Sequence, residues 1–325
     1  MRKVFAQCLL AVFFFCACQN KQKQEILSPE EIAQKDSLAL KIGLMPTIDC
    51  LPFYYAKEQG IYDSLHLDVR IKTYLAQMDC DTAFVGNTVQ VCYTDLIRAL
   101  VLQQKGTGLN VIMATNGSHQ LISSSKSKIS TIKNIKGKMI GLARHSVTDF
   151  LSDYMTTKAR IDTADIFRPQ INDLNIRTQM LENATLDAAF LPEPYATRTL
   201  QKGNRSLFDT SKDSIFLNAF IIRNEALNDS NRNIQLNKLI TGYNMAVDQL
   251  NEQISSHTIS KFLYLIDTPK QVADSIKVVP FKKAELPKKK QIRIAIDWLK
   301  SRNLIPSDYK DTLSSTMYMY NLQNR

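Results

Sequence analysis

A short apolar run that ends in two prolines marks residues 187–195, DAAFLPEPY. The run has the length and composition of a strand, and the prolines prevent its continuation. Glu193 and Tyr195 therefore follow the carboxyl end of a predicted strand, where ligands bind in open α/β sheets. The alternative interpretation is a surface turn with a solvated glutamate.

A second candidate site is residues 141–149, GLARHSVTD. Arg144, Ser146 and Thr148 place a charge and two hydroxyls where a helix is predicted to begin, and helix N-termini favour anions. The alternative is that a hydroxyl only caps the helix. His145 beside Ser146 is weak support for nucleophilic catalysis, because neighbours in sequence rarely adopt triad geometry and no G-x-S-x-G elbow is present.

Two earlier loops also carry polar side chains between an apolar strand and a helix. Thr47 and Asp49 precede the first of these helices, and Thr94 and Asp95 precede the second. Each aspartate is a candidate helix cap or a candidate ligand contact, and the cap is the favoured interpretation for Asp49.

The order of the predicted elements indicates an α/β protein. Strands and helices alternate along the chain, which favours parallel sheets covered by helices. Asn116-Gly117 is the predicted crossing into a second α/β set, and 215–223 is the predicted strand back. We expect strands at 38–44, 66–74, 89–93, 109–114, 120–124, 139–143 and 187–191, and helices at 51–59, 79–84, 96–104, 146–158 and 196–202, with a helical pattern after 224 in which Trp298 is a core residue.

Composition predicts a globular chain long enough for two domains. The 325 residues are 44% hydrophobic and 22% charged, and the net charge is +10. No segment combines basic residues with the aromatics that nucleic-acid binders need, so we expect no nucleic-acid partner. The basic run within 281–290 is interpreted as a solvated face, with contact to anionic lipid or a partner as the alternative.

The first residues have the pattern of an export signal. Arg2 and Lys3 precede an apolar run at 4–15 that is too short to span a membrane. Ala17-Cys18 resembles a bacterial lipobox, although Phe15 stands where leucine is usual and Cys16 is a second candidate. We therefore predict a signal peptide at 1–17, acylation of Cys18, a tether at 18–37 and a membrane-anchored lipoprotein of the cell envelope, facing the periplasm or the exterior. Without acylation the product would be a secreted soluble protein.

Cysteine spacing gives no metal site. Cys50, Cys80 and Cys92 remain after the leader and Cys18, and no pair has the short spacing of zinc ligands. We expect no metal and no cofactor. One disulfide among the three is compatible with an oxidising compartment, and the sequence does not select the pair.

The order of these motifs resembles substrate-binding proteins of bacterial ABC importers, of the nitrate, sulfonate, taurine and thiamine-pyrimidine type. The resemblance rests on five segments: Gly43-Leu44, the 52–60 helix ending in Gly60-Ile61-Tyr62, the segment from 76–79 to Thr94-Asp95-Leu96, and the loops at 141–150 and 187–195. Gln90-Val91 stands where that family often has Asp-Gly. The resemblance implies a two-lobed type II periplasmic-binding-protein fold, each lobe a mixed, mainly parallel sheet flanked by helices.

The resemblance also implies a function. Residues 38–115 and 221–325 would form lobe 1, and 116–220 lobe 2. A monomer would bind an anionic, zwitterionic or aminopyrimidine-like molecule between the lobes and deliver it to a permease and its ATPase, without catalysis. The implied contacts are Thr47, Asp49, Thr94, Asp95, Asn116, Arg144, His145, Ser146, Thr148, Glu193 and Tyr195. The alternatives are an enzyme on the same scaffold, such as a pyrimidine synthase or small-acid dehydratase, and an envelope ligand sensor. The cysteine-rich iron-binding run of the synthase is missing here.

Overall fold

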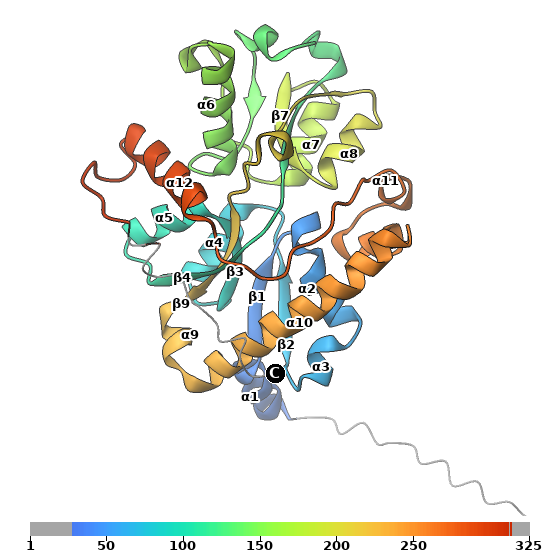
Figure 1. Cartoon of the computed structure of the whole chain (residues 1–325), viewed down its shortest axis with the longest axis vertical. Coiled ribbons are helices and arrows are strands. Elements are labelled where there is room, and N and C mark those ends of the chain that lie inside the picture. Colours follow the sequence, from blue (N-terminus) through green and yellow to red (C-terminus); the bar gives the residue numbers. More distant parts are fainter. Residues whose placement is uncertain (1–27, 312, 314–325) are drawn as a thin grey trace, which may run out of the picture. The chain divides into compact units, whose positions relative to one another are not determined.

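The computed structural model describes residues 28–311 and 313 and divides them into two units (Figure 1). The first unit contains helix α1, Pro29–Leu38, which begins with a reciprocal capping box. Ser28 N donates to Glu31 Oε2 at 2.8 Å, and Glu31 N donates to Ser28 Oγ at 3.2 Å. The predicted leader, Cys18 and residues 18–27 of the predicted tether lie outside the described residues.

The second unit, from Ala39 onward, contains two sheets. The first sheet has the order β2-β1-β3-β9-β4, and the second has the order β6-β7-β5-β8. The strands are β1 Leu40–Leu44, β2 Val69–Thr73, β3 Val91–Asp95, β4 Leu109–Ala114, β5 His119–Ser123, β6 Ile140–Gly141, β7 Ala188–Pro192, β8 Arg205–Asp209 and β9 Asn218–Arg223.

Both sheets are mixed, and most strands in each run in the same direction. Only β9 opposes the other strands of the first sheet, and only β5 opposes those of the second. These are the strands that follow the two crossings between the sheets. The chain leaves β4 or β8 at its carboxyl end and enters the other sheet at the same edge, so the next strand runs away from that edge. The carboxyl ends of the remaining strands therefore gather where the two sheets face each other.

Helices cover both faces of the sheets. They are α2 Leu51–Glu58, α3 Ile61–Ser64, α4 Gln77–Val85, α5 Leu96–Gln104, α6 Val147–Ala159, α7 Leu174–Glu182, α8 Tyr195–Leu200, α9 Asn224–Asn228, α10 Ser230–Ser255, α11 Lys270–Ala273 and α12 Lys289–Ser301. The long helix α10 packs against α2, and α12 packs against α5 (Figure 1). No helix within the described residues is long and apolar enough to cross a bilayer.

Successive side chains along a strand point to opposite faces of the sheet, and the core is accordingly divided into two clusters. In β9, Phe220 and Ile222 belong to one cluster, whereas Ala219 and Ile221 belong to the other. Both faces of the first sheet are thus buried, as in sheets with helices on both sides. Trp298 of α12 is in the second cluster, as predicted, and its Nε1 donates to Asp153 Oδ2 at 2.8 Å.

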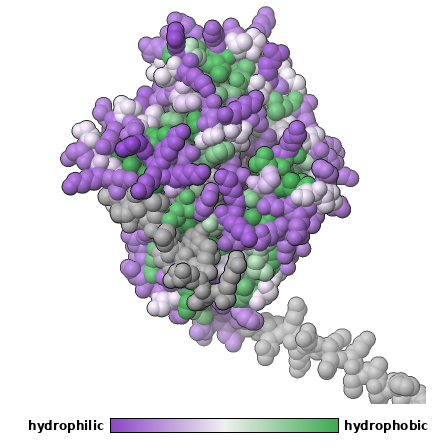
Figure 2. Space-filling view, viewed as in Figure 1, coloured by the Kyte–Doolittle hydropathy of each residue, from purple (hydrophilic) through white to green (hydrophobic). Residues whose placement is uncertain are grey.

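The lysines of the basic run within 281–290, which leads into the start of α12, are exposed, as predicted for a solvated face. Lys282, Lys283 and the three lysines at 288–290 are exposed, while α12 buries its apolar stripe. Figure 2 shows hydrophilic residues over most of the viewed face, with apolar residues in separate small areas. Among the described residues, the part of this face that is not covered in grey shows no large apolar patch.

Candidate functional site

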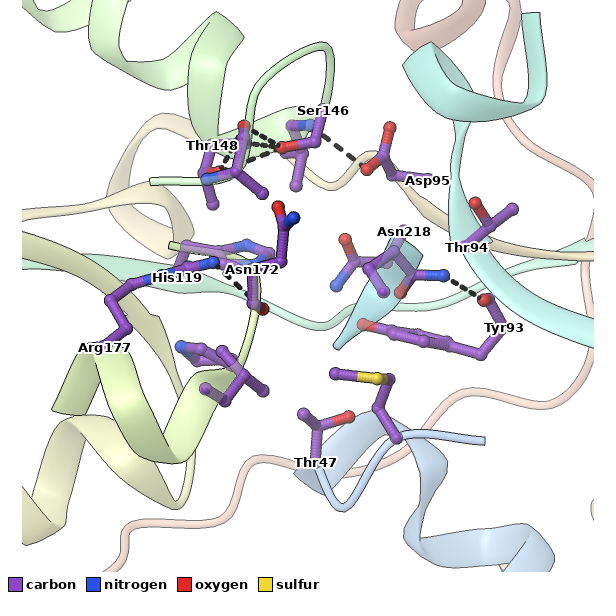
Figure 3. Close-up of a pocket in the computed structure, with 16 residues that line it drawn as sticks. Thr47, Tyr93, Thr94, Asp95, His119, Ser146, Thr148, Asn172, Arg177 and Asn218 are labelled. Atoms are coloured by element: carbon purple, nitrogen blue, oxygen red, sulfur yellow. Dashed lines mark hydrogen bonds between the residues drawn. The ribbon is translucent and has the colours of Figure 1, made fainter. Parts of the chain in front are cut away.

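A cavity of about 50 Å³ lies where the carboxyl ends of the two sheets meet (Figure 3). This volume holds a few water molecules, so a compact ligand fits without further separation of the walls. The first sheet and its loops contribute Met45, Thr47, Gln77, Tyr93, Thr94, Asp95 and Asn218. The second contributes His119, Ala143, Ser146, Val147, Thr148, Asn172, Leu174, Arg177 and Pro192.

Backbone hydrogen bonds hold the two walls of the cavity together. Ile48 N donates to Glu193 O at 3.1 Å. Leu174 N donates to Leu75 O at 3.0 Å, and Ala76 and Asp173 form an isolated bridge beside this bond. These contacts join segments that belong to different sheets, so the structure is a closed form of a two-walled site.

Arg177 supplies a buried positive charge to the cavity. Its side chain extends from α7 towards His119 and Asn172 in Figure 3 and is 2% exposed. The guanidinium donates only to main-chain carbonyls: Nε and Nη2 to Ile171 O, Nη1 to Phe190 O at 3.0 Å, and Nη2 to Asn172 O. Burial lowers the pKa of Arg177 to about 10, so the group remains charged at neutral pH.

No carboxylate within residues 28–311 and 313 forms an ion pair with Arg177. The four bonds to carbonyls leave one of its five N–H groups without an acceptor among the described residues. A buried charge normally has a counter-charge, because neutral dipoles offset only part of the desolvation cost. The Arg177 side of the cavity is therefore suited to an anion.

His119 beside Arg177 is neutral near pH 7. Burial lowers the pKa of the His119 imidazole to about 4, although nearby Asp49 opposes this shift. The cavity thus gains an uncharged imidazole and one guanidinium. Tyr93, Asn172 and Asn218 add neutral polar groups to the lining.

The N-terminus of α6 is occupied by the protein's own side chains. Ser146 Oγ accepts from Thr148 N at 3.1 Å, and Thr148 Oγ1 accepts from Ala143 N at 3.0 Å. Asp149 Oδ2 accepts from His145 N, and Asp95 Oδ2 accepts from Val147 N at 3.1 Å across the site. Helix capping, the alternative interpretation of this loop, is therefore correct for Ser146, and Asp95 occupies an amide that was predicted to face an anion.

Asp95 joins two helices from opposite walls. Its Oδ1 caps α5 by accepting from Arg98 N at 2.9 Å, while Oδ2 accepts the bond from α6. Burial raises the pKa of Asp95 to about 6, although the nearby Arg98 charge and both backbone bonds favour ionisation. Asp81, which pairs with Arg98, adds to the raised value.

This raised pKa predicts a pH-dependent stability difference between the wild type and Asp95→Asn. A carboxyl with a raised folded-state pKa gives its full stability below its unfolded value, 3.8, and loses it as pH rises through about 6. The wild type should therefore lose about 2 to 3 kcal/mol relative to the variant over this range. Asparagine remains a good cap and does not titrate here. Urea unfolding at pH 4, 5, 6 and 7 measures the difference, and a pH-independent difference would contradict the raised pKa of Asp95.

Asp49 is a structural hub and not a helix cap. Its Oδ1 accepts from Thr47 Oγ1 at 2.7 Å. Its Oδ2 accepts from Tyr93 Oη at 2.9 Å, Thr115 Oγ1 at 2.8 Å and Asn218 Nδ2 at 3.0 Å. No side-chain cap bond forms at the start of the Ile48–Cys50 turn or of α2, so the favoured cap interpretation was wrong.

The other predicted residues lie apart from this cavity. Arg144 and His145 line an outer groove between α4, α5 and the loop before α6. A second cavity, of about 560 Å³, lies beside the two segments that cross between the sheets and is lined by Asp49, Asn116 and Glu193. Five of the eleven predicted residues, Thr47, Thr94, Asp95, Ser146 and Thr148, meet in the first cavity.

Glu193 and Tyr195 have structural partners. Glu193 Oε2 accepts from Thr197 N at 3.0 Å in the first turn of α8, and Oε1 accepts from Gln120 Nε2 at 3.1 Å. Burial raises the pKa of Glu193, and the bonds from Thr197 oppose the shift. Tyr195 is buried in the first core cluster. These contacts give residues 193–195 a structural role in the turn before α8. Glu193 is nevertheless partly buried and not solvated as in the predicted surface turn, and it lines the second cavity, so its role as a ligand contact stays a prediction.

The sequence prediction missed α7 and with it Arg177. The signal was present: Asp173 caps the helix by accepting from Ile176 N at 2.9 Å, and the buried positions 174, 177, 178 and 181 have helical spacing. An arginine on the buried stripe of a capped helix indicates a functional charge. The helix was not recognised because Asn175, Arg177, Thr178 and Gln179 interrupt its apolar pattern.

Family membership follows from the match to a sequence-family model. Residues 47–240 match the family described as NMT1/THI5 like. The chain belongs to this family. The match covers more than half of the sequence and confirms the family resemblance that the order of the motifs indicated.

Solved structures of low sequence identity share the fold. The periplasmic aliphatic sulphonate binding protein SsuA from Escherichia coli is 15% identical, with a TM-score of 0.71 over 87% of this chain and 92% of that chain. SsuA from Xanthomonas axonopodis pv. citri, bound to MOPS, is 16% identical, with a TM-score of 0.73 over 86% and 98%. The periplasmic nitrate-binding protein NrtA from Synechocystis PCC 6803 is 12% identical, with a TM-score of 0.72 over 86% and 85%. The predicted two-lobed type II periplasmic-binding-protein fold is confirmed. No curated protein compared with the chain matches it in sequence.

Proposed function

We propose that this protein is a solute-binding protein that captures a small anion between its two lobes. The observation that carries the proposal is Arg177, a buried guanidinium that lines the closed cavity and forms no ion pair within the described residues. The charge of Asp173 opposes only part of the effect of burial on its pKa. A bound anion would accept from the free N–H group of Arg177 and neutralise its charge. Because the ligand would contact both walls, its binding would stabilise the closed form.

The ligand class follows from the lining. The cavity offers one positive charge, and its neutral donors include hydroxyls, side-chain amides and the uncharged imidazole of His119. A compact sulfonate, nitrate or carboxylate suits this set, and the sulphonate-binding and nitrate-binding proteins of the same fold support the class. An aminopyrimidine has less support, because Glu193 is engaged with α8. A zwitterion is also compatible with the lining, because its cationic group could face the Asp95 carboxylate.

Ligand capture is tested on the purified chain. Native mass spectrometry after incubation with a metabolite extract should detect a bound compound, and calorimetry with nitrate, taurine, ethanesulfonate and acetate should give its class. Recovery of the compound unchanged supports binding without catalysis. Its conversion would indicate the enzyme alternative, and absence of any anion binding would contradict the proposal.

The partners belong to the same proposal. A monomer in the cell envelope would present the closed form to an ABC permease and its ATPase, as the family and the named binding proteins suggest. Genes for a permease and an ATPase beside this gene would support import. A neighbouring membrane kinase would favour the sensor alternative.

Attachment to the membrane is predicted to depend on Cys18. Acyl chains on this cysteine would tether the chain, since two buried chains give stable anchoring. Cys18→Ala should therefore move the protein from the membrane fraction to the soluble fraction. Cys16→Ala is the matched control, and it should leave the distribution unchanged. Membrane retention of Cys18→Ala would contradict the anchor.

A further inference from the structure

Two buried cysteines from different elements meet behind the cavity wall. Cys80 of α4 and Cys92 of β3 are both 0% exposed, and their Sγ atoms are 3.0 Å apart. A disulfide has an S–S bond of about 2.05 Å, so the sulfurs need to approach by only about 1 Å. The two side chains already point towards each other.

The surrounding packing keeps the two sulfurs together. Gly43 of β1 is the registered partner of Cys92 in the parallel pair. A Cβ atom at Gly43 would lie 2.8 Å from Cys80 Sγ and 3.3 Å from Val89 Cγ2. The glycine therefore provides the space that Cys80 occupies above the sheet, and little space is left for the sulfurs to separate.

Cys50 does not share this site. It lies in the first core cluster, whereas Cys80 and Cys92 belong to the second. The sequence alone did not select a pair among the three cysteines, and the fold now selects one. The odd cysteine remains as a single buried thiol.

We propose that Cys80 and Cys92 form a disulfide in the exported protein. The predicted leader would direct the chain to an oxidising compartment. The oxidant is a protein or small-molecule disulfide: one cysteine thiolate attacks it and releases the first thiol, and the second cysteine attacks the mixed disulfide and releases the second. The two cysteines lose two protons and two electrons, and the oxidant gains them as two thiols.

The bond forms before the chain has finished folding. Burial raises the pKa of the Cys92 thiol, so little thiolate is present once β3 is covered. The same burial then protects the disulfide from reductants. The completed bond is therefore a structural crosslink and not a reversible switch.

The crosslink would fix the first-lobe wall of the cavity. Gln77 at the start of α4 donates to Tyr93 O at 2.6 Å, and Asp81 accepts from Thr94 Oγ1 at 3.3 Å. A bond between positions 80 and 92 holds these hydrogen-bonded segments in register. It closes a short loop and restricts the unfolded chain.

Trypsin places Cys80 and Cys92 on one peptide and Cys50 on another, which allows the disulfide to be tested. Residues 73–98 contain no lysine or arginine before Arg98, so one peptide carries both Cys80 and Cys92, while residues 42–57 carry Cys50. The full chain is exported with its leader, denatured in iodoacetamide without reductant, digested and analysed by mass spectrometry. The 73–98 peptide should be unlabelled and lighter by two hydrogen atoms than the reduced peptide, whereas the 42–57 peptide carries one label.

Two labels on the 73–98 peptide, or a crosslink from it to another peptide, would overturn the proposal. A sample reduced before labelling gives the reference mass. A second readout is thermal unfolding: reduction should lower the Tm of the wild type and of Cys50→Ser by roughly 5 to 10 °C. Reduction should leave the Tm of Cys92→Ser unchanged, and an equal decrease in this variant would contradict the crosslink.

Discussion

Arg177→Met should weaken binding of the anionic ligand by about 2 to 5 kcal/mol, or roughly 30-fold to several-thousand-fold in Kd. Methionine has a similar length but carries no charge and no donor. The anion would lose its only cationic partner in the cavity lining within the described residues. Calorimetry with the compact anion that binds the wild type most tightly measures the change.

Arg177→Lys separates charge from geometry. Lysine keeps the charge as a compact ammonium and lacks the planar fork that holds the carbonyls of Ile171 and Phe190. We expect an affinity between those of the wild type and Arg177→Met. The matched control is Arg144→Met, because Arg144 lies in the outer groove with its Nε 3.6 Å from Asp149 Oδ2.

Stability measurements separate a loss of anion binding from a loss of folding in Arg177→Met. In the absence of ligand, Arg177→Met removes a poorly compensated charge but also leaves carbonyls without a donor, so these effects on unfolding oppose each other. Added anion should raise the Tm of the wild type and of Arg144→Met, and it should not raise that of Arg177→Met. Equal anion affinity of the wild type and Arg177→Met would contradict the role of this residue.

The position of the site could be predicted from the sequence because it depends on strand ends. Thr47 and Ser146 follow apolar strands, Thr94 lies at the carboxyl end of β3, and chain topology brings these ends to one edge. The direction of a side chain beyond the strand end was harder to predict. Arg144 and Ser146 are two residues apart, yet one faces the outer groove and the other the cavity.

The partners of a polar residue could not be predicted from the local sequence. Asp49 precedes a helix and so resembled a cap, but its acceptors are used by side chains from 44, 66 and 169 residues away. Glu193 similarly accepts from Gln120 Nε2, 73 residues away, in addition to its local bond from Thr197 N. A charged or polar side chain takes the nearest available partner in three dimensions, and a local pattern contains no information on distant partners.

Asp49→Ala should destabilise the protein by about 3 to 5 kcal/mol, because it removes the acceptor of four buried side-chain donors at once. Asp49 is 5% exposed, so its removal leaves these donors in a largely buried environment. Its partners Tyr93, Thr115 and Asn218 lie on β3, after β4 and on β9, so the loss affects both the sheet and the crossings between lobes. Urea unfolding measures the change.

The matched control is Asp68→Ala, which removes an exposed carboxylate paired with Arg70 and should cost less than about 1 kcal/mol.

Gly117→Ala tests the hydrogen bonds around Asp49 without changing its carboxylate. A Cβ at this position would lie 2.2 Å from Asp49 Oδ2 and 2.7 Å from Asn218 Nδ2, so the crossing segment or the hub must move. We expect Gly117→Ala to lower stability and to weaken anion binding, since Asn218 also lines the cavity. If Asp49→Ala unfolds at the same urea concentration as Asp68→Ala, the hub does not hold the crossings, and closure of the lobes must depend on the backbone bonds at Ile48 and Leu174 instead.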